Sequence, residues 1–498
     1  MKHPRVLRVA VCAFLTMGTA GQALAESIFV DQGFQSGSED GSRNAPYRTI
    51  TQALKEARRL RYGAGDLAPS PRKIIVHVAA GTYVGSFNAA VFDPATASYD
   101  PSKEELPLLL NVSGIELRGA TQLTDDAGGL PVAVVDGTAT TLRADVRPGP
   151  QQYLVLITRT FARSDSGFPE GLAMAGDGTT VSGFVVDGRG LDGLRAANPS
   201  VGIAVDRVGE FVVHRNYITN ASNGVWTSQA SGRIDGNLVL QNTTNGIAVG
   251  GGSRVYPADV RVSGNRVNRN ANLGLGLTGA GETEDFGGVG RRSLDLGVNK
   301  FTRVPIPVFD RSVNPDEIPE KLFVRVVGNE FNDHTLSGVR AASYFAFPYQ
   351  TANGSQEQRS EITAIFTNNV CQSNARHGIV ADAGFPRKEN PRKWTGMMNL
   401  TFDGNALDGN GWAPVMLDLW RYQDSMNEAL GTPNPANFRY LHDSTYEVSG
   451  DLDDFDYNNR SVDPIDGTAT NNVFRVNGVE RGGATGVGPE ICILNCRP

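Results

Sequence analysis

The fold is decided by the stretch NYITNASNGVWTS, residues 216–228, because its pattern returns twice directly afterwards. It recurs as NLVLQNTTNGIAV over residues 237–249 and as NRVNRNANLGLGL over residues 265–277. Each copy places an Asn before apolar residues and, after a polar interval, a Gly before alternating apolar residues. In five of six copies the Gly position follows the Asn by nine residues, and in the first copy by eight. The later copies run from Asn329 to Val339, from Asn369 to Ile379, and from Asn405 to Val415, where Pro414 replaces Gly.

Constant spacing within the copies and variable gaps between them are typical of a coiled solenoid with looped-out insertions. Strands of three or four residues cannot bury an apolar face alone, but coils stacked about 4.8 Å apart pair in parallel ladders around a shared core. An Asn at each corner tolerates a left-handed backbone, and its amide bonds backbone groups or the next Asn. The alternative, Asn residues marking turns in a β-sandwich, does not explain a second polar column five residues later: Asn242, Asn270, His334, Asn374 and Asn410.

Residues 1–25 have the features of an export signal. Lys2, Arg5 and Arg8 precede an apolar run too short to span a bilayer, and Ala23-Leu24-Ala25 is a small-x-small cleavage site. We therefore predict cleavage after Ala25, a periplasmic or secreted location, and no transmembrane segment. Export permits disulfides. A Cys492–Cys496 pair would close a small loop, whereas Cys371 is interpreted as a small core residue rather than a nucleophile.

Residues 26–85 predict an N-terminal cap and a first coil. Apolar residues from Ile50 to Leu60 follow a helical stripe between two apolar strands. The segments IFVDQG (28–33), NAPYRTITQALKEA (44–57) and IIVHVAAGTYV (74–84) resemble the N-terminal signature of exported bacterial right-handed parallel β-helix proteins in the pectate-lyase-like superfamily.

This resemblance implies an all-β chain, a right-handed parallel β-helix with an N-terminal amphipathic capping helix. The β-helix covers residues 86–480 and a C-terminal tail covers residues 481–498. The superfamily includes lyases, hydrolases, epimerases, phage tailspikes and adhesins, so the resemblance implies a fold and not one activity. Its Asn-Thr-Asp and Asp-Asp motifs for polygalacturonase-like enzymes are missing here, and only Arg376-His377-Gly378-Ile379 resembles part of a His-Gly motif.

Weaker coils precede the clear ones, and insertions interrupt them. The largest insertion, residues 278–319, carries many charged residues. It is interpreted either as a wall of a binding cleft or as a solvent-exposed loop with no role in binding. A last coil is predicted from Val473 to Val479. The weaker coils lie at Leu108 to Arg118, Val132 to Gly137, Tyr153 to Thr158 and Thr180 to Asp187.

Candidate site residues follow from the alternation of side chains after each Gly, because the second and fourth residues beyond it point outward. The fourth-residue column ends in Asp382 and Asp418, whose backbones lie roughly 5 Å apart if their coils stack directly. Two such close carboxylates suppress each other's ionisation and provide one acid and one base. Arg340, one coil earlier, is placed to neutralise a uronate carboxylate. We predict Asp382, Asp418 and Arg340 as catalytic residues.

Substrate-binding residues are predicted on the same face. Trp226 is expected as an exposed plate for stacking on sugar rings. The remaining members of this predicted set are Asp206, Tyr344, His377 and Trp420. The competing interpretation is that outward polar residues only cap turns, and that His377 is a satisfied turn residue.

These features predict an exported carbohydrate-active protein that cleaves or modifies a polysaccharide, with acidic polymers the favoured class; lyase and hydrolase chemistry both stay open. The alternative is a non-catalytic surface or envelope protein that binds glycans or protein partners. The net charge of −7 gives no general attraction to nucleic acid. No cofactor or metal is predicted; calcium is the one alternative left open, but the acidic run from Asp451 to Asp456 lacks the Gly and distal Glu of a calcium loop. The sequence does not specify the number of subunits.

Overall fold

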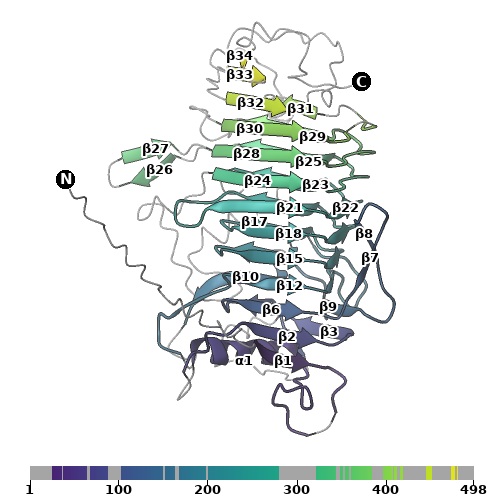
Figure 1. Ribbon diagram of the computed structural model, residues 1–498, viewed down its shortest axis with the longest axis vertical. Helices are drawn as coiled ribbons and strands as arrows, with labels where there is room; N and C mark the ends of the chain where they lie inside the picture. The colour runs from purple at the N-terminus through teal and green to yellow at the C-terminus, as the bar shows by residue number, and fades with distance from the viewer. Residues whose placement is uncertain are drawn as a thin grey trace, which may run out of the picture.

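The chain winds into a tall stack of coils (Figure 1). The computed structural model describes residues 25–35, 37–63, 68–87, 103–149, 152–162, 168–197, 200–279, 321–343, 348–351, 354–357, 360–383, 396–407, 409–411, 415–418, 445–450, 473–476 and 479–480. The predicted signal peptide, nearly all of the 278–319 insertion, and the C-terminal tail with Cys492 and Cys496 lie outside these residues.

Three long sheets, which we call A, B and C, run along the described part of the stack. Sheet A has the order β1 (Glu26–Val30), β2 (Ile74–Val78), β6 (Ile115–Arg118), β12 (Thr180–Ser182), β15 (Phe211–His214), β18 (Gly232–Asp235), β21 (Ala258–Ser263), β24 (Lys321–Val327), β28 (Ser360–Thr367), β30 (Gly396–Asp403), β32 (Thr445–Gly450), β33 (Val473–Val476) and β34 (Val479–Glu480). Sheet B has the order β22 (Arg266–Asn268), β19 (Leu238–Leu240), β16 (Tyr217–Thr219), β13 (Val185–Asp187), β9 (Thr140–Ala144), β3 (Gly81–Ser86) and β4 (Glu104–Glu105). Sheet C has the order β11 (Ala173–Ala175), β10 (Tyr153–Phe161), β14 (Val201–Asp206), β17 (Asn223–Ser228), β20 (Asn245–Gly250), β23 (Leu273–Thr278), β25 (Ser337–Ser343), β29 (Ile379–Ala383) and β31 (Val415–Asp418), with β5 (Leu108–Leu110) paired to β10.

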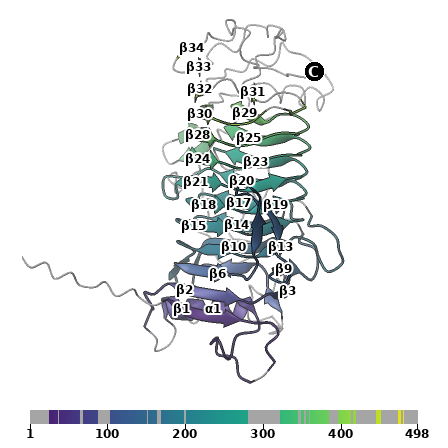
Figure 2. The same ribbon diagram turned by 45° about the vertical axis from the view of Figure 1, so that its right-hand side comes forward.

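Neighbouring rungs of these sheets pair in parallel, for example β17 with β20 and β21 with β24. Each coil passes through sheet A, then B, then C, and Figure 2 shows the strands of A and C as adjoining columns. Side chains that alternate inward, such as Val260, Val262, Leu275 and Leu277, are fully buried in one core that extends along the stack. Cys371 belongs to this core, as predicted. The predicted parallel β-helix is confirmed.

Two predicted coils are wrong in detail. The run from Val132 to Gly137 does not form a rung; β8 (Pro131–Val134) instead pairs antiparallel with β7 (Leu123–Asp125) in a hairpin outside the three sheets. At the far end, β33 extends sheet A, but β34 folds back on it antiparallel rather than completing a coil. A second hairpin joins β26 (Pro348–Thr351) and β27 (Gly354–Glu357).

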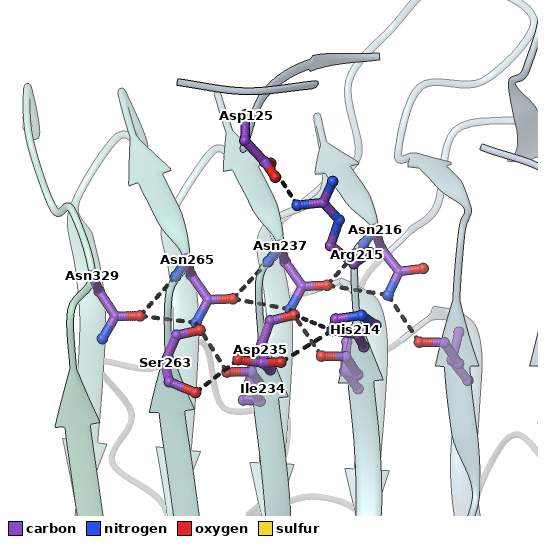
Figure 3. Close-up of polar contacts among 12 residues, drawn as sticks. Asp125, His214, Arg215, Asn216, Ile234, Asp235, Asn237, Ser263, Asn265 and Asn329 are labelled. Atoms are coloured by element: carbon purple, nitrogen blue, oxygen red, sulfur yellow. Dashed lines mark hydrogen bonds and ion pairs between the residues drawn. The ribbon is translucent and has the colours of Figure 1, made fainter. Parts of the chain in front are cut away.

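A buried ladder of asparagine side chains lines the corner between sheets A and B (Figure 3). The Asn237 backbone N–H and its side-chain Nδ2 both donate to Asn265 Oδ1, at 2.9 Å each. Asn265 repeats both bonds to Asn329 Oδ1, at 3.0 and 2.9 Å, and its Nδ2 also donates to the Ile234 carbonyl at 2.9 Å. Each amide therefore joins three rungs. The complete ladder is Asn216, Asn237, Asn265, Asn329, Asn369 and Asn405.

The second polar column forms a similar ladder at the corner between sheets B and C. Asn242 donates from its backbone and its side chain to Asn270 Oδ1, at 2.9 Å each. His334 takes the next position: its Nδ1 accepts from the Asn270 N–H at 3.2 Å, and its Nε2 lies 2.8 Å from the Val267 carbonyl. The ring therefore holds its proton on Nε2 and stays neutral. Burial lowers the His334 pKa to about 4.

The left-handed backbone at these corners falls one residue earlier than predicted. The residue before each ladder Asn has a positive φ, as at Arg215 (54°), Gly236 (61°) and Asn368 (53°), whereas the ladder Asn residues do not. The same holds in the second column, at Gln241 (58°) and Arg269 (57°). The ladder Asn is thus selected for its amide, and the backbone strain lies on its neighbour.

Helix α1 (Ile50–Tyr62) forms where the apolar stripe predicts it, and it buries Ile50, Ala53, Leu54 and Ala57. The Glu104 carboxylate accepts from the Ile50 and Thr51 N–H groups at 2.7 and 2.8 Å, which ties the helix N-terminus to sheet B. Burial nevertheless raises the Glu104 pKa to about 7. Figure 1 places α1 at the N-terminal end of the stack, and its role as a cap stays a prediction.

We expect Asn265→Ala to destabilise the fold by several kcal/mol, because Asn237 and Asn329 lose buried partners. Asn245→Ala is the matched control: Asn245 is equally buried, but its amide has no hydrogen-bond partner in the described part of the chain. Urea unfolding of both variants measures the difference. Equal losses would show that the ladder bonds contribute little.

We expect His334→Asn to reduce acid sensitivity. The folded pKa of about 4 lies below the ordinary 6.5, so the unfolded state takes up the proton first. Stability is therefore complete above pH 6.5 and falls as the pH drops toward 4, by about 3 kcal/mol at most. Asn cannot titrate and suits the ladder. Urea unfolding at pH 7.5 and 4.5 measures the free energy of unfolding of both proteins. The stability of the variant relative to the wild type should be higher at pH 4.5 than at pH 7.5, and an equal difference at both pH values would contradict this assignment.

Candidate functional site

The outer face of sheet C has the register that the sequence predicts. In the second-residue column, Ala204, Trp226 and Ala248 are direct partners on β14, β17 and β20. The column continues through Gly276, Arg340, Val380 and Met416. Ile203 and Val205 face the main core, whereas Ala204 and Trp226 belong to a separate apolar cluster. The second-residue column therefore points away from the main core at β14 and β17.

The three predicted catalytic residues lie on neighbouring rungs. Asp382 on β29 is the register partner of Asp418 on β31, and Ala342 on β25 is the partner of Asp382. Arg340 lies two residues before Ala342, so it occupies the adjacent column one rung from Asp382. The backbones of the two Asp residues are described and their side chains lie outside the described part; the Arg340 side chain is partly exposed.

Trp226 is not the exposed plate that the sequence predicts. Its side chain is only 8% exposed and packs in a cluster with Tyr153, Leu156, Ala204 and Ala248 on the outer side of sheet C. The reason is that the outward positions of four successive rungs are apolar or small, so they associate with one another. Outward orientation from the coil therefore does not mean exposure to solvent.

Asp206 ends β14 beside an unusual arginine. Arg207 has a left-handed backbone (φ 54°) and a buried side chain whose Nε lies 4.0 Å from Asp206 Oδ2. Burial raises the Asp206 pKa above its ordinary value, and the Arg207 charge opposes that shift. The Arg207 Nε makes no hydrogen bond within the described part of the chain. The two residues form a charged pair at the edge of the apolar cluster.

The predicted site residues fall into two groups along sheet C. Asp206 and Trp226 lie on β14 and β17, whereas Asp382 and Asp418 lie on β29 and β31, several rungs further along. His377 is buried at the turn before β29, where its carbonyl accepts from the Gly338 N–H at 3.0 Å. Tyr344 and Trp420 lie outside the described residues. One small ligand cannot contact both groups.

Sequence reasoning missed a further outward column, formed by the residue before each Gly. Asn223 and Asn245 stand there on β17 and β20, and Ser337 stands on β25. All three are buried, and neither amide nor the Ser337 hydroxyl has a hydrogen-bond partner in the described residues. Buried polar groups of this kind are rare and are candidates for ligand contacts. The sequence does contain a signal for this column, because a polar residue stands directly before the Gly in these copies of the repeat.

Within the described residues, no three His, Cys, Asp or Glu side chains gather in a group suited to a metal ion. The described helix is too short and too polar to cross a membrane.

A family model described as the right-handed β-helix region matches residues 168–285. This match agrees with the strand order, and both show the fold of a right-handed parallel β-helix. No curated protein sequence matches the chain.

Several solved structures are similar in fold. The A-module of the mannuronan C-5 epimerase AlgE4 from Azotobacter vinelandii aligns with a TM-score of 0.40 and 13% identity, over 85% of this chain and 89% of that one. The catalytic unit of an α-1,3-glucanase from Streptomyces thermodiastaticus aligns with a TM-score of 0.36 and 14% identity, over 91% and 68%. The periplasmic alginate epimerase AlgG gives 0.33 and 12%, over 83% and 84%. Similarity at this level does not identify a substrate or a reaction.

We expect Trp226→Ala to cost about 3–5 kcal/mol of stability, because it removes a large buried side chain from the outer cluster. An exposed plate would cost little on truncation. Tyr217→Ala, at a partly exposed aromatic residue of sheet B, is the control and should cost less. Thermal or urea unfolding measures both. A near-neutral Trp226→Ala would restore the exposed-plate interpretation.

Proposed function

We propose that the protein is exported and that it cleaves or modifies a polysaccharide on the outer face of sheet C. The observation that carries this proposal is the register of Asp382 with Asp418, which puts two outward carboxylate positions on adjacent rungs. Parallel rungs are about 4.8 Å apart, close to the roughly 5–5.5 Å that separates the carboxyl groups of retaining glycosidases.

The chemistry follows from charge. Two carboxylates at this spacing repel, so one holds a proton as the acid while its neighbour stays ionised as base or nucleophile. Arg340 supplies the opposite charge one rung away. Lyases and epimerases that act on uronates begin with a base that removes the ring proton next to the carboxylate. Negative charge then builds up on that carboxylate, and a guanidinium bound to it stabilises the charge. Acidic polysaccharides are therefore the substrate class that we favour.

The alternative is a non-catalytic envelope or surface protein that binds glycans or protein partners along the solenoid. The apolar outer cluster around Trp226 supports it, because this part of sheet C offers packing rather than a polar groove. Export is common to both proposals. It rests on residues 1–25, and N-terminal sequencing of the mature protein should begin at Glu26.

We expect Asp382→Asn and Asp418→Asn each to lower activity by at least about 100-fold while changing stability by less than about 1 kcal/mol. Activity is measured on a polysaccharide panel by reducing ends, by absorbance of unsaturated uronates, and by sugar composition. Arg340→Lys should harm turnover of uronates more than that of neutral glycans, because the two-pronged contact is lost.

Thr278→Ala, in the same column as the Asp pair but two rungs from Asp382, and Arg118→Lys on sheet A are the matched controls. Activity that survives both Asn substitutions would remove this site. Absence of any activity across the panel would favour the binding protein.

A further inference from the structure

Three exposed arginines stand at one register position on the outer face of sheet A. Arg233 on β18 is the direct partner of Arg261 on β21, which is the partner of Arg325 on β24. Their inward neighbours Ile234, Val262 and Val326 are fully buried, so the three guanidinium groups extend from the opposite side. The three strands form consecutive rungs in Figure 1. We call Arg233, Arg261 and Arg325 the arginine ladder.

The ladder works against the stability of the fold. Like charges directly opposite each other on neighbouring strands are destabilising, and two unit charges one rung apart repel by about 1 kcal/mol in water. Arg233 and Arg261 form no ion pair or hydrogen bond within the described residues. Insertions of different length separate the three arginines in the sequence, so their alignment does not follow from a simple repeat.

The groups beside the ladder determine which ligand it suits. The Arg325 guanidinium lies over the Phe323 ring, 4.5 Å from its centroid, and pairs with Asp259 Oδ1 at 3.1 Å. Asp235, a second carboxylate on this face, lies 3.1 Å from His214 and accepts from the Ser263 hydroxyl at 2.8 Å, and the Arg233 charge helps these contacts to lower its pKa. Arg233 and Arg261 therefore keep their hydrogen-bond donors for an external anion, although Asp235 lies near Arg233, and a partly exposed aromatic ring lies next to Arg325.

We propose that the arginine ladder binds a linear uronic-acid polysaccharide that lies along the axis of the stack. One rung of about 4.8 Å is close to the length of one pyranose residue, so the carboxylates along one edge of an extended chain come within reach of the long arginine side chains. A planar guanidinium forms paired hydrogen bonds with a carboxylate, and Phe323 offers an apolar surface to a sugar ring. The chain carries a net charge of −7, so this attraction is local to the ladder.

This surface is separate from the proposed catalytic face of sheet C. An enzyme that acts on a long chain gains from a second contact, because binding at one place raises the effective concentration of polymer at the other. Binding at the ladder does not depend on any reaction at Asp382 or Asp418. The two proposals therefore succeed or fail separately.

The test is equilibrium binding of oligogalacturonate to the full mature chain in an Asp382→Asn background, which prevents turnover if sheet C is catalytic. We expect the Arg233→Gln/Arg261→Gln double variant to bind about tenfold more weakly or worse, with a shallower dependence on salt. Arg118→Gln/Arg269→Gln removes the same charge elsewhere and should bind within about twofold of the background protein. Asp259→Asn should tighten binding, because it releases Arg325 from a competing carboxylate.

Four outcomes would overturn the proposal. The first is an unchanged affinity in the ladder double variant, and the second is an equal loss in the control double variant. The third is a weaker affinity for Asp259→Asn. The fourth is a neutral glucan or a single-stranded DNA oligonucleotide that binds through the ladder as tightly as the uronate. Unfolding midpoints within about 2 °C of the parent confirm that all variants fold, since exposed substitutions rarely cost more than about 0.5 kcal/mol.

Discussion

The buried stack of asparagine amides at the corner between sheets A and B is the interaction on which the rest of the structure depends. Each turn of the chain there buries backbone groups that no strand partner satisfies, and each amide bonds the rung on either side. Successive ladder residues are 21, 28, 64, 40 and 36 positions apart in the sequence, yet the bonds have the same geometry throughout. The ladder therefore fixes the register of the coils from Asn216 to Asn405, whatever is inserted between them.

Because the register is fixed, residues at the same position of successive coils line up in columns on the surface. Strands held at one corner present corresponding residues at constant spacing, with no side-chain entropy spent on bringing the rungs into line. The same constraint aligns Asp382 with Asp418 on sheet C and Arg233 with Arg261 on sheet A. A surface site in this fold can thus be built from residues at one position of several coils, with no compact local motif in the sequence.

The sequence predicts the columns well because the Asn and the Gly mark two points of each coil, and alternation supplies the rest. Prediction from the sequence fails where contacts with residues outside the coil determine the exposure of a side chain or the pairing of a strand. The exposure of Trp226 depends on what its outward neighbours do, and those neighbours cluster. Val132 to Val134 has the composition of a rung strand, but four residues do not distinguish a rung from a hairpin. The left-handed positions also escape prediction, because residues as different as Arg215 and Gly236 occupy them.

The arginine ladder shows what such a fixed register implies for charge. On a loop or a helix surface, like-charged side chains relieve repulsion through small shifts of the backbone. Here the strands that carry Arg233, Arg261 and Arg325 hydrogen-bond to one another and end at corners locked by Asn237, Asn265 and Asn329. The backbone positions cannot separate, so the repulsion is reduced only by side-chain rearrangement and by neighbouring carboxylates such as Asp259. A stack that holds its charges in place in this way is organised in advance for the proposed uronate ligand, whose binding would then need no movement of the backbone.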